Sequence, residues 1–149
     1  MKKFYVILPA VFMLFICSNL SAQTIGKLFK KAEADSIFGK VYFSQTMDSK
    51  LIKKILDDST NVMMFRVTKD SLIVMDIHRK PLHPSSYKPR GDEPYYLYSK
   101  DMLKKLFDQY DEINEETTAT AQMRGSTVTI TAGSLTLENS MVCPPVCPY

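Results

Sequence analysis

The sequence predicts an α+β fold, in which a single antiparallel sheet packs against two to three helices. Two observations predict it. Segments with the helical period alternate with short β-prone runs along residues 23–149, a length that suits one domain. A strand–helix pair at residues 41–56 is also followed, about 54 residues later, by a similar pair at residues 95–107. One interpretation of this similarity is a duplicated β-α-β-β unit with both helices on one face, which leaves the other face to water or a partner. The alternative is that any strand–helix pair with a Lys-rich exposed face looks like this.

The elements of the first unit follow from periodicity. Apolar residues recur at helical spacing over residues 25–38, and Gly39 ends that predicted helix. A short strand at residues 41–43 precedes Asp48, whose carboxylate is expected to cap a helix with its apolar stripe on one side. Residues 62–68 and 71–77 are rich in Val, Ile, Met and Phe, and they predict a β-hairpin with a short polar turn.

The second unit begins after a loop. Residues 79–94 contain four prolines and few apolar residues. Residues 95–98 predict a strand, and Ser99 is expected to cap the helix that follows. The acidic residues 108–116 are expected to connect this helix to three further strands. The middle strand of these three, residues 127–131, alternates strictly, which predicts one buried and one wet face. The three strands are predicted at residues 117–123, 127–131 and 134–137.

The N-terminus has the layout of a secretory signal peptide over residues 1–22. Two lysines precede an apolar run of about thirteen residues, which is shorter than a membrane span, and cleavage is expected after Ala22. The Ser-Ala-Gln ending resembles the leaders of Bacteroidetes-type bacteria. We therefore expect a periplasmic or extracellular protein. Lipidation at Cys17 is the less favoured alternative, because the bulky Phe15 and Ile16 precede it.

Composition and motifs exclude several classes of function. The chain without its leader is near neutral, which disfavours nucleic acid as a partner, and no second long apolar stretch predicts an integral membrane segment. No nucleophile elbow, phosphate-binding glycine loop or zinc motif is present. The two histidines, His78 and His83, have Pro81 between them and lack helical ligand spacing. We therefore predict no catalytic residues, no metal site at these histidines and no cofactor.

The proline-rich loop joins the two units and offers candidate binding residues. Its prolines restrict the backbone, so little conformational entropy is lost when a partner binds. Its basic and aromatic side chains would suit an acidic or extended partner. The alternative is a plain crossover, in which proline only fixes the path of the chain. The candidate binding residues are Arg79, Lys80, Tyr87, Lys88 and Arg90.

The tail at residues 141–149 ends in Met-Val-Cys-Pro-Pro-Val-Cys-Pro-Tyr. Cleavage of the leader leaves two cysteines, and an even number in an exported protein favours a disulfide between Cys143 and Cys147. A turn at Pro144 and Pro145 would bring the two sulfurs together. The clasped turn, together with Tyr149, is a second candidate contact for a partner.

The same tail supports another interpretation. The segment from Cys143 to Pro148 resembles the C-x-x-x-C-P motif of Sco-type copper chaperones. This resemblance implies Cu(I) binding by two thiolates, to which the Met141 thioether could be added. The family motif opens a helix in a thioredoxin-like fold, whereas here it lies at the end of the chain.

Two hypotheses of function follow. The first is an exported, non-enzymatic protein-binding domain of a bacterial envelope, of which a small protease inhibitor is one concrete form. The alternative is copper handling through the C-terminal cysteine pair.

Overall fold

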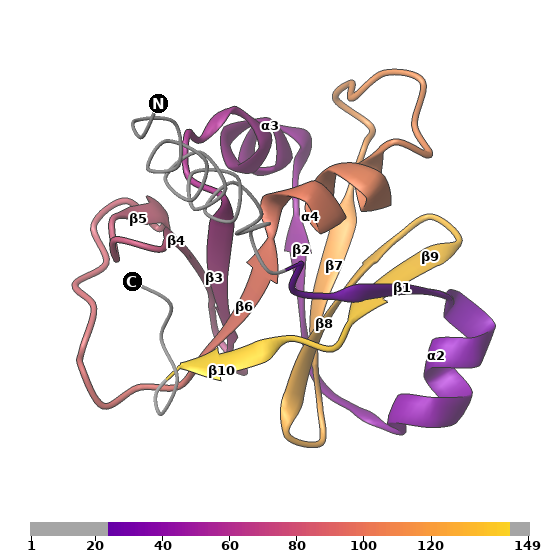
Figure 1. Ribbon diagram of the computed structural model, residues 1–149, viewed down its shortest axis with the longest axis horizontal. Helices are drawn as coiled ribbons and strands as arrows, with labels where there is room; N and C mark the ends of the chain where they lie inside the picture. The colour runs from indigo at the N-terminus through magenta and orange to yellow at the C-terminus, as the bar shows by residue number, and fades with distance from the viewer. Residues whose placement is uncertain (1–23, 144–149) are drawn as a thin grey trace, which may run out of the picture.

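The computed structural model describes residues 24–143. The predicted leader 1–22, Cys147 and the predicted tail contacts Pro144, Pro145 and Tyr149 lie outside the described residues. The described part confirms the α+β class, but its strands form two antiparallel sheets rather than one (Figure 1). Sheet A has the order β1 (Lys27–Lys30), β9 (Leu135–Glu138), β8 (Thr127–Ala132), β7 (Ala119–Arg124) and β2 (Val41–Met47). Sheet B has the order β10 (Met141–Cys143), β6 (Tyr95–Ser99), β3 (Val62–Val67), β4 (Leu72–Asp76) and β5 (Pro81–His83).

Two sheets form because the two predicted units exchange their first strands. β2, which opens the first unit, pairs with β7 of the second unit. β6, which opens the second unit, pairs with β3 of the first. Along the chain, each unit keeps the predicted order of strand, helix and hairpin. The two sheets therefore have equivalent strand orders, which are β2-β7-β8-β9 in sheet A and β6-β3-β4-β5 in sheet B. The expectation of a single sheet was therefore wrong, because neither unit closes a sheet with its own strands.

The main core lies between the sheets and two of the helices. α3 (Ser49–Asp57) and α4 (Lys100–Phe107) contact each other and lie side by side in Figure 1. The predicted cap of α3 is confirmed, since the Leu51 amide donates to Asp48 Oδ1 at 2.8 Å. Ser99 precedes α4 as predicted, but its hydroxyl donates to the Ile25 carbonyl oxygen at 3.1 Å instead of capping the helix.

The predicted helix over residues 25–38 is divided in the structure. Residues 27–30 form β1, which pairs with β9, and only α2 (Lys31–Phe38) is helical. Apolar residues at positions 25, 28 and 29 fit a strand as well as a helix, because a four-residue run is too short to separate the two periods. Gly26 precedes β1 at a φ of 115°, a conformation that favours glycine, and it turns the chain into the strand.

The outer face of sheet A is covered, contrary to the alternation expected for residues 127–131. Thr129 is 0% exposed on this face. The α2 crossover forms part of the cover: the rings of Phe38 and Phe29 pack edge to face at 5.1 Å, and Asp35 Oδ1 lies 2.7 Å from Arg124 Nη2. Arg124 itself is buried. The wet face was predicted wrongly, because a crossing segment covers it. Thr129 Oγ1 is buried there without a hydrogen-bond partner among the described residues.

Sheet B is also covered on both faces. Every residue of β4 and β6 is buried, and Met64, Met75 and Leu97 belong to a second apolar cluster on the face away from the main core. Tyr87 of the proline loop packs against that cluster. Neither strand therefore offers the open sheet face that was considered as a docking surface. Within residues 24–143, none of the helices combines the length and the apolar character needed to span a bilayer.

Substitution of Gly26 tests the entry into β1. An added Cβ would lie 2.9 Å from Leu137 Cδ1 and 3.0 Å from Tyr98 Cδ1, at a backbone angle that disfavours any L side chain. Gly26→Ala is expected to lower the free energy of unfolding by about 2 kcal/mol in urea denaturation. Gly91→Ala is the matched control, because no atom lies within 4 Å of its added Cβ. Equal stability of the two variants would contradict this packing.

Glu138 provides a pH test of the covered face of sheet A. Burial raises the pKa of the Glu138 carboxyl, and its Oε2 has no hydrogen-bond partner among the described residues. Its contribution to stability is therefore lost as pH rises from the unfolded pKa of about 4.3 through the folded pKa. Glu138→Gln is expected to raise the melting temperature at pH 7 by roughly 2–4 °C, and the gain should shrink toward pH 4. A gain that does not change with pH would contradict the raised pKa.

Candidate binding surface

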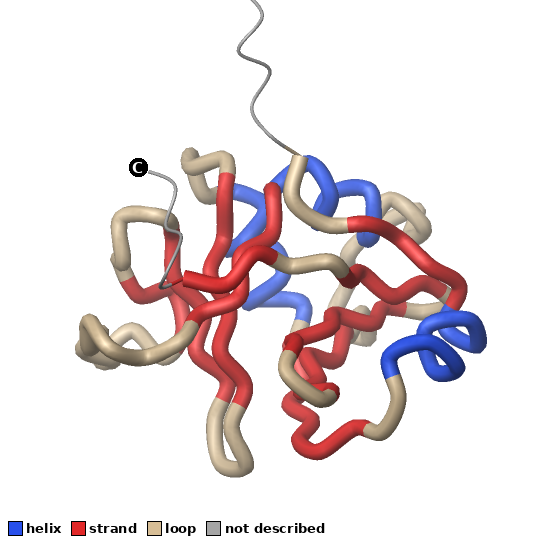
Figure 2. The backbone as a smooth tube through the Cα atoms, turned by 60° about the horizontal axis from the view of Figure 1, so that its bottom comes forward, coloured by secondary structure: helices blue, strands red, loops and turns tan. Residues whose placement is uncertain are grey.

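The proline-rich loop leaves sheet B after β4 and returns to it as β6. Most of it is loop as predicted, but β5 pairs with β4 inside it. The peptide bond between His83 and Pro84 is cis. Tyr87 Oη reaches back toward the base of the loop, where it lies 2.9 Å from Tyr95 Oη. The loop therefore folds back against sheet B (Figure 2).

A carboxylate that the sequence analysis missed holds the loop together. Glu93 Oε2 accepts hydrogen bonds from Tyr87 Oη and from Tyr95 Oη, the latter at 2.9 Å. Glu93 Oε1 lies 2.8 Å from Arg66 Nη1 in a partly buried ion pair. The hydrogen bond from Tyr87 lowers the pKa of the Glu93 carboxyl, while burial raises the pKa of the Tyr95 hydroxyl. The loop is therefore tied by charge-assisted bonds to β3 and β6.

Arg79 also makes contacts that hold the loop in place. Its guanidinium carbon lies 5.8 Å from the centre of the Tyr95 ring, and its Nη1 donates to the Arg90 carbonyl oxygen at 3.3 Å. A guanidinium over an aromatic ring is stabilised by the ring quadrupole. Arg79 and Tyr87, both predicted as binding residues, thus have structural partners. Lys80, Lys88 and Arg90 are exposed.

Two of these exposed cations border a hollow of about 730 Å³. Lys88 and Arg90 lie on its rim, and Glu93 contributes a carboxylate whose oxygens are already engaged by Tyr87, Tyr95 and Arg66. The charged side chains of this hollow that have no ion-pair partner among the described residues are therefore both cations. Its lining consists of Pro84, Ser86, Tyr87, Lys88, Pro89, Arg90 and Glu93.

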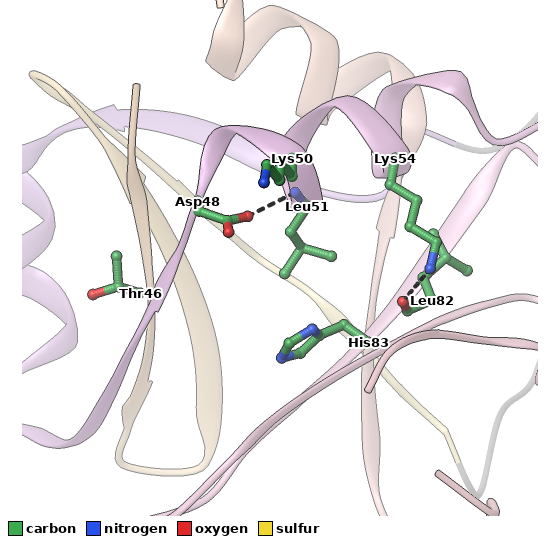
Figure 3. A pocket seen from close by; sticks show the side chains of 7 residues that line it. All are labelled: Thr46, Asp48, Lys50, Leu51, Lys54, Leu82 and His83. Carbon is green, nitrogen blue, oxygen red and sulfur yellow. Dashed lines mark hydrogen bonds between the residues drawn. The ribbon is translucent and has the colours of Figure 1, made fainter. Parts of the chain in front are cut away.

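A second hollow of about 440 Å³ lies between β5 and the start of α3 (Figure 3). Lys54 Nζ donates to the Leu82 carbonyl oxygen at 2.6 Å, which joins α3 to β5. Asp48 is used by the cap of α3, whereas the side chains of Lys50 and His83 also line the space. Because β5 runs directly into the loop, the two hollows flank one continuous segment, residues 82–84.

Of the predicted copper ligands, Met141 and Cys143 lie in β10, and Cys147 lies outside the described residues. Among residues 24–143, no group of three His, Cys, Asp or Glu side chains is arranged to hold a metal ion. Cys143 is buried in β10 and pairs with Tyr95 of β6. The disulfide with Cys147 and the copper site at the same pair stay predictions, because Cys147 lies outside the described residues.

The role of Glu93 is visible only from the residues that contact it in the folded structure. In the sequence it is one acidic residue near the end of a polar loop, and its partners Arg66, Tyr87 and Tyr95 are up to 27 positions away. Tyr95, Tyr96 and Tyr98 of the adjacent strand are all buried. No signal in the sequence indicated that the Tyr87 and Tyr95 hydroxyls share one carboxylate.

Comparison with known proteins gives no family: no family model, curated protein or solved structure matches the chain.

Glu93→Gln tests whether this carboxylate fixes the loop. A lowered pKa means that the carboxylate stabilises the fold above the unfolded pKa of about 4.3, and that this stability is lost as pH falls through the folded pKa. The variant is expected to lose about 1 kcal/mol in urea denaturation at pH 7, and progressively less as pH is lowered through the folded pKa. Amide hydrogen exchange in residues 84–93 should be faster at pH 7.

Asp92→Asn is the matched control, because it removes an adjacent carboxylate that is exposed. It should leave both stability and exchange unchanged. If the two variants behave alike, the charge of the loop rather than the Glu93 network would explain the result.

Proposed function

We propose that this chain is an exported, non-enzymatic protein-binding domain of a bacterial envelope, which captures an extended acidic segment of a partner at the proline-rich loop. The observation that carries the proposal is the hollow of about 730 Å³ with Lys88 and Arg90 on its rim. Both cations are exposed, and no carboxylate pairs with them among the described residues. An acidic segment would supply the missing counter-charges.

The contacts that order the loop favour binding. Glu93, Tyr87 and Arg79 hold the loop against sheet B through the contacts described above. A loop that is already ordered loses less conformational entropy when a partner binds, so more of the contact energy contributes to affinity. Arg79 and Tyr87 thus order the loop, Lys88 and Arg90 face the partner, and Lys80 is exposed but lines neither hollow.

The shape favours a segment rather than a compact ligand. Leu82 and His83 line one hollow and Pro84 lines the other, and Lys50 and Lys54 place two cations beside the Asp48 carboxylate in the hollow against α3. An extended acidic peptide could contact both, whereas a single carboxylate would use only one. Electrostatic contacts of this exposed kind set specificity and association rate and weaken with salt.

Charge reversal tests the proposal. Lys88→Glu/Arg90→Glu is expected to weaken binding of a fluorescein-labelled Glu-rich peptide by about tenfold or more, measured by fluorescence anisotropy at low salt. Binding to the unaltered protein should decline as salt is raised from about 0.05 to 0.3 M. A Lys-rich peptide with the same label controls for non-specific association.

Lys104→Glu/Lys105→Glu is the matched control, because it makes the same change of charge on the exposed side of α4. This variant should bind the Glu-rich peptide nearly as well as the unaltered protein. Equal losses in both variants would assign the effect to net charge, and no binding by the unaltered protein would remove the proposal.

A further inference from the structure

The acidic connection, residues 108–118 between α4 and β7, carries five exposed carboxylates. They are Asp108, Asp111, Glu112, Glu115 and Glu116. None of them forms an ion pair with another described residue. The cations next to them in the chain, Lys104 and Lys105 of α4, are fewer, so the charge of this surface is negative. The connection therefore has the charge that the hollow of the proline-rich loop lacks.

Two of these carboxylates are presented on an ordered turn. The Thr117 amide donates to the Asn114 carbonyl oxygen at 3.1 Å, and the Glu116 amide donates to Asn114 Oδ1 at 3.0 Å. Glu115 and Glu116 are the middle residues of this turn, and the connection projects beyond α4 and β7 in Figure 1. Because the backbone is already ordered, little conformational entropy is lost when these carboxylates bind a second molecule.

The connection lies too far from the proline-rich loop to pair with it inside one copy. In Figure 1 the loop lies at the left, beside β5, whereas the connection lies at the upper right, with α3 and α4 between them. Neither ion pair of the described residues joins the two segments. One copy thus presents cations on one side and carboxylates on another, and each set can be neutralised by a second copy.

We propose that the acidic connection of one copy is the partner of the proline-rich loop of the next copy, so that the chain associates head to tail. Glu115 and Glu116 enter the hollow of about 730 Å³ and pair with Lys88 and Arg90. This inference rests on the proposed function, because it uses the same hollow and names the acidic segment that it captures.

The positions of the two segments determine the kind of assembly. A contact between two different surfaces leaves one unused copy of each surface at the ends of every pair, unless a ring closes. Further copies can therefore add, and the assembly grows with protein concentration instead of stopping at a dimer. Exposed ion pairs are individually weak and are screened by salt, so the association is reversible and depends on ionic strength.

Sedimentation velocity at increasing protein concentration tests the assembly. The weight-average sedimentation coefficient is expected to rise with concentration at about 0.05 M salt, and the rise should be largely lost at about 0.3 M. Glu115→Lys/Glu116→Lys and Lys88→Glu/Arg90→Glu should each stay monomeric in both conditions. Growth that persists in either variant would overturn the proposal.

A mixture of these two variants tests the contact itself. One variant has an acidic loop and the other a basic connection, so unlike charges meet again only when the two are combined. The equimolar mixture is expected to associate at low salt, and its failure to do so would contradict the contact. In the unaltered protein, carbodiimide cross-linking of labelled and unlabelled chains should join Lys88 of one copy to Glu115 or Glu116 of another.

Glu33→Lys/Asp70→Lys is the matched control, because it makes the same change of charge at exposed carboxylates outside the connection. It should associate like the unaltered protein. Binding of the Glu-rich peptide without any concentration-dependent sedimentation would overturn this inference and leave the proposed function standing. If the unaltered protein neither binds the peptide nor associates, both are wrong.

Discussion

The exchange of β2 and β6 between the two halves of the chain determines most of the structure. Because each strand completes the sheet of the other half, the two halves of the chain cannot separate without breaking strand pairs in both sheets. The fully buried Tyr98 adds a direct link, since it belongs to β6 in sheet B and its hydroxyl donates to the Val128 carbonyl oxygen in sheet A. Buried backbone acceptors that gain such a partner are satisfied across the core instead of within one sheet. The two helices then cover a core that both halves share.

Away from the core, single charged side chains bind several partners at once. Glu93 joins one arginine and two tyrosines, so a loop of proline and polar residues is ordered without an apolar core of its own. Arg124 performs the corresponding task on the other side of the molecule, where it connects Asp35 of α2 and Gln122 of β7 at 2.7 Å each. Buried ion pairs contribute to specificity of arrangement more surely than to stability, because the cost of desolvation offsets their attraction. In both places a single charged side chain positions a crossing segment.

The proposed contact at the proline-rich loop depends on charge and on the order of the loop. The loop presents the cations Lys88 and Arg90 on a backbone held against sheet B, and its selectivity would come from charge and from the fixed path of that backbone. Salt would weaken such a contact, because screening acts on charges.

The sequence by itself determined the elements whose signals are local. The cap at Asp48, the hairpin of β3 and β4, and the position of α4 follow from side chains within a few residues of one another, and all three agree with the structure. Tertiary structure decided what depends on distant partners: the exchange of strands, the conversion of residues 27–30 into an edge strand beside β9, and the burial of Thr129. It also decided that Tyr87 and Arg79 order the loop while Lys88 and Arg90 remain free of carboxylate partners within the described chain. The physical reason is that periodicity and capping are properties of neighbouring residues, whereas strand pairing and shared carboxylates depend on which surfaces meet when the chain folds.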